Sequence, residues 1–174
     1  EGDSYFDMLS SPLYPFGFGL SYTEFEISDY CLENVSAEKI TVSATIKNTG
    51  KVSGKEVVQI YVSLPGGILE KEARRLCAYT KTSELKPGES EKVSLVIDMN
   101  QLTSYDEKRA AWILEGGFYG IWAGNSLASA KLCAGVKLDK EVISCQVKNL
   151  FPLKQKLEEK TQEAGKTSAR EKEA

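Results

Sequence analysis

Histidine is absent from the 174-residue sequence, and this absence excludes the commonest catalytic arrangements. A Ser-His-Asp triad or a Cys-His pair needs an imidazole as its general base, so neither can exist in this chain. The four cysteines form no CxxC pair and have no histidine to complete a mixed zinc site, so no metal or cofactor site is expected. Free thiols are favoured because two of the four lie in apolar stretches. The cysteines are Cys31, Cys77, Cys133 and Cys145.

Long apolar runs and a basic surface are missing as well. No stretch approaches the ~20 consecutive apolar residues of a membrane-spanning helix. The formal net charge is -3, and adjacent basic residues such as Arg74 and Arg75 lie beside Glu70 and Glu72. We therefore expect neither a nucleic-acid partner nor a membrane partner. No secretion signal is visible after Glu1, which favours a cytoplasmic location over a secreted one, although a fragment would have lost such a signal.

The residues that are present indicate β-strands. In residues 40–47 apolar and polar side chains alternate, which is the period-two pattern of a strand with one buried face. The apolar positions are Ile40, Val42, Ala44 and Ile46. Residues 56–63 are rich in β-branched and aromatic side chains and stop at Pro65, so they predict a second strand.

Similar signals predict further strands, and their number indicates the fold class. They occupy residues 25–27, 76–79, 93–97, 111–114, 118–122 and 128–136, with a short helical turn at 99–105. Since 111–114 and 118–122 flank Gly116 and Gly117, we expect them to form an antiparallel pair around a glycine-bearing turn. About seven short strands without an amphipathic helix predict an all-β fold, an antiparallel two-sheet sandwich.

The composition changes at Lys154. From there to Ala174 six basic and five acidic residues leave few apolar anchors, so we expect a charged C-terminal linker or tail with at most partial helical order.

The most specific motif lies near the N-terminus. It reads Tyr14-Pro15-Phe16-Gly17-Phe18-Gly19-Leu20-Ser21-Tyr22-Thr23 and is followed by Phe25. This motif resembles the first segment of the fibronectin III-like domain of family 3 glycoside hydrolases, notably β-glucosidases. The resemblance continues through residues 48–50, 54–62, 85–90 and 117–124 and covers roughly Leu13 to Val136. It implies a fibronectin III or immunoglobulin-like sandwich.

The same motif has a physical interpretation. Pro15 fixes its own φ, Gly17 and Gly19 permit unusual backbone angles, and the aromatic rings offer a large apolar area. Two interpretations stay open: the rings cap the core of their own domain, or they dock onto an adjacent catalytic domain. The candidate interface residues are Tyr14, Phe16, Phe18 and Tyr22.

The resemblance also implies a domain organisation. Residues 1–12 look like a leader from a preceding α/β domain, and 13–138 are the fibronectin III-like sandwich. Residues 139–153 are expected to hold one more strand, at 141–147, and an exit segment that in a swapped domain order leads to a barrel. Residues 154–174 are the charged linker or tail.

No catalytic residue is expected in this chain. Retaining or inverting glycoside hydrolysis needs two carboxyl groups flanking the scissile bond, and nothing singles out such a pair. Asp98, Asp106 and Glu115 lie near aromatic residues, but acids at strand ends and turns are common. By resemblance, the parent hydrolyses terminal β-D-glucosyl residues with retention, and the partners of this module are the catalytic barrel and α/β domains of the same chain.

Three functions therefore follow as hypotheses. The leading one is a non-catalytic structural module that braces the sugar-cleaving domains. The second is a carbohydrate-binding module for a β-glucoside or glucan, with Trp112, Tyr119 and Trp122 as sugar-stacking candidates, although core packing of these rings is favoured. The third is a protein-protein interaction module, because the fold alone does not specify function.

Overall fold

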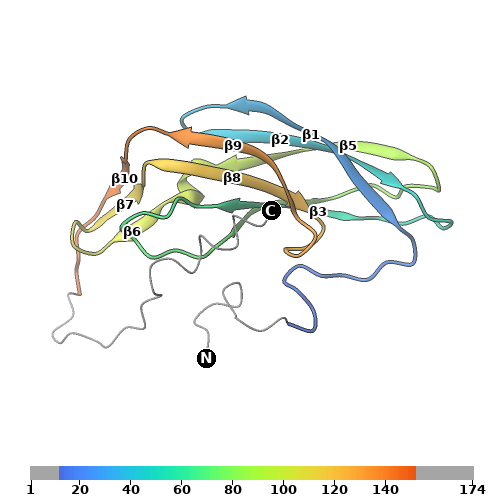
Figure 1. Cartoon of the computed structure of the whole chain (residues 1–174), viewed down its shortest axis with the longest axis horizontal. Helices are drawn as coiled ribbons and strands as arrows, with labels where there is room; N and C mark the ends of the chain where they lie inside the picture. The colour runs from blue at the N-terminus through green and yellow to red at the C-terminus, as the bar shows by residue number, and fades with distance from the viewer. Residues whose placement is uncertain (1–11, 152–174) are drawn as a thin grey trace.

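The computed structural model describes residues 12–151, which form ten strands and one short 3-10 helix with every strand pairing antiparallel (Figure 1). The elements are β1 Phe25–Val35, β2 Lys39–Asn48, β3 Val57–Ser63, β4 Arg75–Lys81, β5 Ser90–Asp98, η2 Met99–Leu102, β6 Ser104–Asp106, β7 Ala111–Leu114, β8 Gly117–Gly124, β9 Lys131–Leu138 and β10 Val142–Gln146. No helix in this part of the chain is long and apolar enough to cross a bilayer.

Two sheets pack face to face and form the sandwich. One has the strand order β1-β2-β5 and the other β4-β3-β8-β9. Their edges meet where β1 contacts β9 and where β4 contacts β5. The side chains between the layers form the main core, including Ile40, Ile46, Ile60, Ile97 and Ile121. The all-β sandwich predicted from the sequence is confirmed.

The alternation read from the sequence determines which face of each central strand enters this core. In β2 the apolar residues of the period-two pattern are all buried. In β3 both faces are buried: Val58, Ile60 and Val62 face the core, while Gln59 and Tyr61 lie on the opposite face. An outward face of a sheet is buried only if other chain segments cover it, and here residues near Phe16 and Leu127 do so.

A third small sheet, with the order β10-β7-β6, corrects two predictions. The expected pairing of 111–114 with 118–122 is wrong, because β7 pairs with β6 and β10 while β8 pairs with β3 and β9. The residues between β7 and β8 explain why the two strands do not pair. Gly117 has a φ of 145°, and the Glu115 carboxylate binds backbone N–H groups of the loop between β3 and β4, so the chain turns away from a hairpin. The helical turn expected at 99–105 ends at Leu102, and Ser104–Asp106 form β6 instead. The strand expected at 141–147 is present as β10, and the two sheets of the sandwich hold seven strands, as predicted.

Two predicted segments lie outside the described residues. The charged tail at 154–174 is wholly outside them, and the leader at 1–12 is outside except for Pro12.

Candidate interdomain contact site

Residues 13–24, here called the aromatic segment, lead along the outer face of the four-stranded sheet to the start of β1 in the other sheet (Figure 1, dark blue). Phe18 N–H donates to the Pro15 carbonyl at 3.0 Å, which closes a tight turn. Gly17 lies inside this turn with a φ of 76°, in the left-handed region that favours glycine. The Phe16 carbonyl accepts from Leu127 N–H at 2.9 Å, so the turn is tied to the loop after β8.

Gln59 on β3 holds the aromatic segment against the sheet. Its side-chain nitrogen donates to the Gly17 carbonyl at 3.0 Å and to the Asn125 carbonyl at 2.7 Å. Its side-chain oxygen accepts from the Tyr61 hydroxyl, and burial raises the pKa of Tyr61 to about 12, so this hydroxyl stays a donor at neutral pH. A Cβ on Gly17 would lie 2.8 Å from the Tyr61 hydroxyl, so a larger residue cannot take this place without displacing the clamp.

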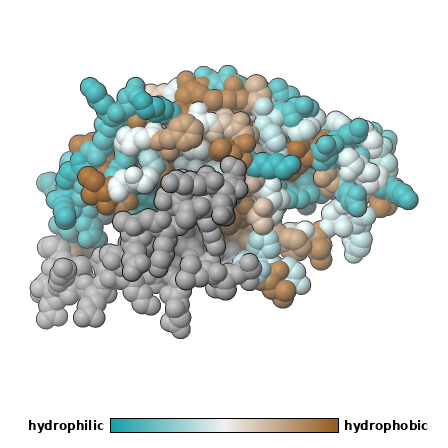
Figure 2. Space-filling view, in the orientation of Figure 1, coloured by the Kyte–Doolittle hydropathy of each residue, from teal (hydrophilic) through white to brown (hydrophobic). Residues whose placement is uncertain are grey.

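The four candidate interface residues divide into one anchor and three exposed rings. Phe16 packs edge-on against Tyr61 with ring centroids 6.4 Å apart. Tyr14 and Phe18 pack against each other at 5.4 Å, yet they are 61% and 45% exposed, and Tyr22 is fully exposed at 100%. Figure 2 shows hydrophobic side chains on this segment, below the sheets. Aromatic rings gathered on a fixed backbone form a surface suited to contact with another apolar surface.

A second, buried apolar cluster lies beneath the aromatic segment on the outer face of β3 and β8. Tyr61 and Trp122 form its buried centre with Ala130, and Leu76 and Leu127 pack around them. The guanidinium of Arg74 lies 3.4 Å from the centroid of the Trp122 ring, in a cation-π contact. The indole N–H of Trp122 donates to the Ser63 hydroxyl at 3.1 Å, so the polar end of this ring is satisfied inside the protein.

Asn48, at the end of β2, fixes the far end of the aromatic segment. Its amide nitrogen donates to the carbonyls of Val52 and Leu85, both at 2.8 Å. Its amide oxygen accepts from the Thr23 hydroxyl at 2.8 Å and from Gly50 N–H at 3.0 Å. All four hydrogen bonds that an asparagine amide can make are therefore formed by a completely buried side chain.

The loop between β3 and β4 is organised by a buried ion pair. Lys71 and Glu115 are each only 7% exposed and contact each other directly. The Glu115 carboxylate also accepts from Ile68 N–H at 2.7 Å, and the Lys71 ammonium donates to the Pro65 and Leu69 carbonyls at 3.2 Å. The charges are thus paired and hydrogen-bonded, as buried charges must be.

The other acidic candidates also have structural partners. Asp98 caps η2 by accepting from Asn100 N–H at 2.9 Å. Asp106 binds Arg109, and this hydrogen bond lowers the pKa of the Asp106 carboxyl. Among residues 12–151 no cluster of acidic and cysteine side chains is arranged to hold a metal ion. These carboxylates cap turns and form ion pairs with basic side chains.

The three sugar-stacking candidates lie in different environments. Tyr119 is 2% exposed in the main core and Trp122 is 8% exposed under Arg74, so neither ring can face a ligand. A platform of all three rings is therefore excluded by burial. Trp112 is 43% exposed on β7, and it packs against Tyr105 of β6, a residue that the sequence analysis placed in a helical turn.

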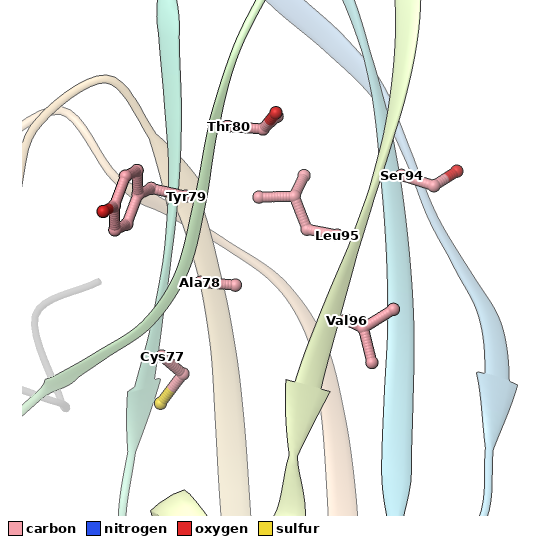
Figure 3. A pocket seen from close by; sticks show the side chains of 7 residues that line it. All are labelled: Cys77, Ala78, Tyr79, Thr80, Ser94, Leu95 and Val96. Atoms are coloured by element: carbon pink, nitrogen blue, oxygen red, sulfur yellow. The ribbon is translucent and has the colours of Figure 1, made fainter.

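A groove also runs between the edge strands β4 and β5 (Figure 3). It encloses about 380 Å³, and Leu95 points into it while Tyr79 points away. Its lining includes Cys77, whose thiol pKa burial raises to about 12, so this thiol is a structural apolar group rather than a nucleophile.

Comparisons with known proteins agree with this architecture. Residues 56–127 match the family described as fibronectin type III-like domain. A protein named β-glucosidase A from Butyrivibrio fibrisolvens is 41% identical over an alignment of 155 residues, which covers 78% of this chain and 19% of that protein.

Solved structures show the same likeness. β-Glucosidase 3B from Thermotoga neapolitana, in complex with glucose, is 38% identical with a TM-score of 0.73, over 79% of this chain and 19% of that one. A GH3 β-glucosidase from Bifidobacterium adolescentis is 34% identical with a TM-score of 0.67, over 72% of this chain and 18% of that one. The chain therefore spans about a fifth of the length of these relatives.

Proposed function

The chain is a fibronectin type III-like module of the kind found in family 3 glycoside hydrolases, and from this premise we propose that it braces the sugar-cleaving domains of a longer, β-glucosidase-like polypeptide. In this proposal the module itself is non-catalytic. Its partners are the barrel and α/β domains of the same polypeptide, which hydrolyse terminal β-D-glucosyl residues.

The observation that carries the proposal is the fixed yet exposed aromatic segment. Its backbone is held by the Gln59 clamp at one end and by Asn48 at the other, while Tyr14, Phe18 and Tyr22 face solvent. A flexible linker would leave two domains free to reorient, whereas a pinned segment with an apolar face can hold them in one arrangement.

The energetic scale supports such a role. Full burial of one large apolar side chain contributes about 1.5–3 kcal/mol. Tyr22 is fully exposed and Phe18 is 45% exposed in this chain, so burying both rings against a neighbouring domain would stabilise the contact by about 2–4 kcal/mol. Their exposure in this chain means that replacing them costs the module itself little.

The experiment compares the isolated chain with a longer polypeptide that also contains the barrel and α/β domains. We would replace Phe18 and Tyr22 together by serine in both and measure melting temperatures and hydrolysis of an aryl β-glucoside. The double variant should lower the melting temperature and activity of the long polypeptide while leaving the melting temperature of the isolated chain nearly unchanged. The isolated chain should show no hydrolysis.

Ile68→Ser serves as the control, since Ile68 is also a large exposed apolar residue but lies in the loop that follows β3, at the end of this strand away from Gln59 and the aromatic segment. This substitution should leave the melting temperature of both polypeptides and the activity of the long polypeptide unchanged. If the double variant left the long polypeptide as stable and active as the wild type, the bracing role would be refuted. Turnover by the isolated chain would refute its non-catalytic assignment.

A further inference from the structure

The small sheet β10-β7-β6 presents an aromatic pair that the sandwich does not use. Tyr105 pairs in register with Trp112, and Trp112 pairs with Cys145, so these three side chains form a row across the three strands. The rings of Tyr105 and Trp112 lie 5.3 Å apart at 49° to each other. Figure 1 shows this sheet at the opposite end of the molecule from the aromatic segment.

The polar ends of these two rings differ from those of the buried rings. The Trp122 indole binds Ser63, the Tyr61 hydroxyl binds Gln59, and the Tyr119 hydroxyl binds the Glu115 carbonyl. Within the part of the chain that the structure describes, neither the indole N–H of Trp112 nor the hydroxyl of Tyr105 has a hydrogen-bond partner. Both groups are therefore open to a ligand beside an exposed apolar ring face.

The strands under the pair are held rigidly by polar contacts. Asp106 accepts from Lys108 N–H at 2.9 Å, which fixes the turn between β6 and β7. Arg109 binds both Asp106 and Glu141 and so ties this turn to the chain just before β10. The Gln146 amide donates to the Arg109 carbonyl at 2.7 Å and secures the end of β10. A preformed site on tied strands loses little entropy when a ligand binds.

We propose that Tyr105 and Trp112 form a stacking platform for a β-linked oligosaccharide. A pyranose ring with equatorial hydroxyls exposes axial C–H groups on its faces, and these pack on aromatic rings while the hydroxyls bind polar groups at the rim. The open indole N–H and phenol supply such groups at the pair, and the turn beside it carries the exposed Glu107 and Lys108. Relatives named β-glucosidases make a β-linked glucosyl chain the first ligand to test.

The chain suits a direct test because it contains two tryptophans and hence two indole N–H signals in a proton-nitrogen NMR spectrum. We would titrate the full chain with cellopentaose and with laminaripentaose, using maltopentaose as the α-linked control. The Trp112 signal should shift and saturate with at least one β-linked chain, while the Trp122 signal stays in place. Calorimetry should show that Trp112→Ala and Tyr105→Ala each lower the affinity at least about tenfold.

Tyr79→Ala is the matched control and should bind like the wild type, because Tyr79 is an exposed aromatic residue on a different sheet. An unchanged Trp122 signal in each variant shows that the sandwich is still folded. The platform would be overturned if no saturable Trp112 shift occurred up to about 10 mM oligosaccharide, or if Trp112 responded only to a protein domain. Equal affinity for maltopentaose would overturn the choice of a β-linked ligand. The test does not depend on the bracing role, since the two surfaces lie at opposite ends.

Discussion

Asn48 should be among the most sensitive positions of this module, because one buried amide joins four backbone or side-chain groups from separate segments. Asn48→Ala removes all four hydrogen bonds at once. It leaves the Val52 carbonyl and the Thr23 hydroxyl without this partner, whereas Gly50 N–H still donates to the Glu24 carbonyl and the Leu85 carbonyl still accepts from Gly54 N–H. The end of the aromatic segment and the turn after β2 would both loosen.

The expected decrease in the free energy of unfolding follows from these hydrogen bonds. A typical intramolecular hydrogen bond contributes about 1 kcal/mol net, and a buried group left unsatisfied costs about 1–3 kcal/mol. Water entering the vacated space would satisfy some of the four groups, so we expect a loss of about 3–4 kcal/mol. This is a large part of the 5–15 kcal/mol that stabilises an ordinary domain, roughly speaking.

Asn48→Asp distinguishes the contribution of the hydrogen bonds that the amide donates from the contribution of those that it accepts. The carboxylate keeps both accepting interactions but places negative charge against two carbonyl oxygens, which should raise the pKa of the new carboxyl in the folded state. A folded-state pKa above the unfolded value makes the variant relatively more stable at low pH, because the protonated acid can donate to one carbonyl. The deficit of Asn48→Asp should therefore shrink as the pH falls, whereas that of Asn48→Ala should not.

Urea unfolding monitored by tryptophan fluorescence measures these losses, with Asn34→Ala as a control at an exposed asparagine on β1. The control should change the free energy of unfolding by less than about 0.5 kcal/mol. A loss below about 1 kcal/mol for Asn48→Ala would refute the idea that its four bonds act together.

Three further outcomes are expected. Gly17→Ala, at a φ of 76° and against the clamp, should cost about 1–3 kcal/mol and hasten chymotrypsin cleavage in the aromatic segment; unchanged cleavage would contradict the pinning. Glu115→Gln should cost about 3 kcal/mol in urea unfolding by leaving Lys71 buried without its counter-charge. A Lys71→Met/Glu115→Gln double variant should recover most of this loss, because glutamine keeps an acceptor for the Ile68 N–H; a larger loss in the double variant would contradict this. Hydrogen bonding to Arg109 lowers the pKa of Glu141, so its stabilising effect is complete above the ordinary value of 4.5 and is lost as the pH falls through the lower folded-state value. The indole N–H signal of Trp112 should show an acid transition that Glu141→Gln weakens, with Asp106 supplying the remainder because it binds the same Arg109; an unchanged transition would contradict this.

Much of the sandwich could be predicted because its central strands carry strong local signals. The alternation in residues 40–47 persists in β2, since one face of that strand meets the core. β1 was recognised only at its start, because register shifts after Ser28 and after Leu32 break the period of two. An edge strand with such shifts has no continuous buried face, so hydrophobic periodicity cannot show its full length.

The failed pairing of β7 with β8 has a different cause. Two apolar runs joined by Gly116 and Gly117 have the local chemistry of a hairpin. The competing signal was not local: the Glu115 carboxylate binds the loop 64–74, which is far away in the sequence. Tyr105 was missed for a related reason, since β6 has only three residues and gains its strand character from pairing with β7.

The difference between local signals and long-range contacts also explains which part of the candidate site could be predicted, the aromatic segment or the Gln59 clamp. The motif around Tyr14 was visible because proline, glycines and aromatic residues occur together in one short stretch. The clamp that fixes it was not, because Gln59 is an ordinary polar residue in a strand and its role depends on contacts with Gly17 and Asn125. Residues that position a site act through distant neighbours, and one sequence does not show which neighbours they have.

The position of the two surfaces on one sandwich has a mechanical consequence. β3 and β8 pair directly from Gln59, beside the aromatic segment, to Ser63, beside the loop that Glu115 holds. These strands share one close-packed core, and Leu114 of β7 packs into the same core, so the small sheet is anchored to the sandwich. A domain held at the aromatic segment and an oligosaccharide held at Trp112 would therefore keep a fixed separation. In such a module, loosening the Gln59 clamp should free the orientation of the neighbouring domain without weakening oligosaccharide binding at the other end.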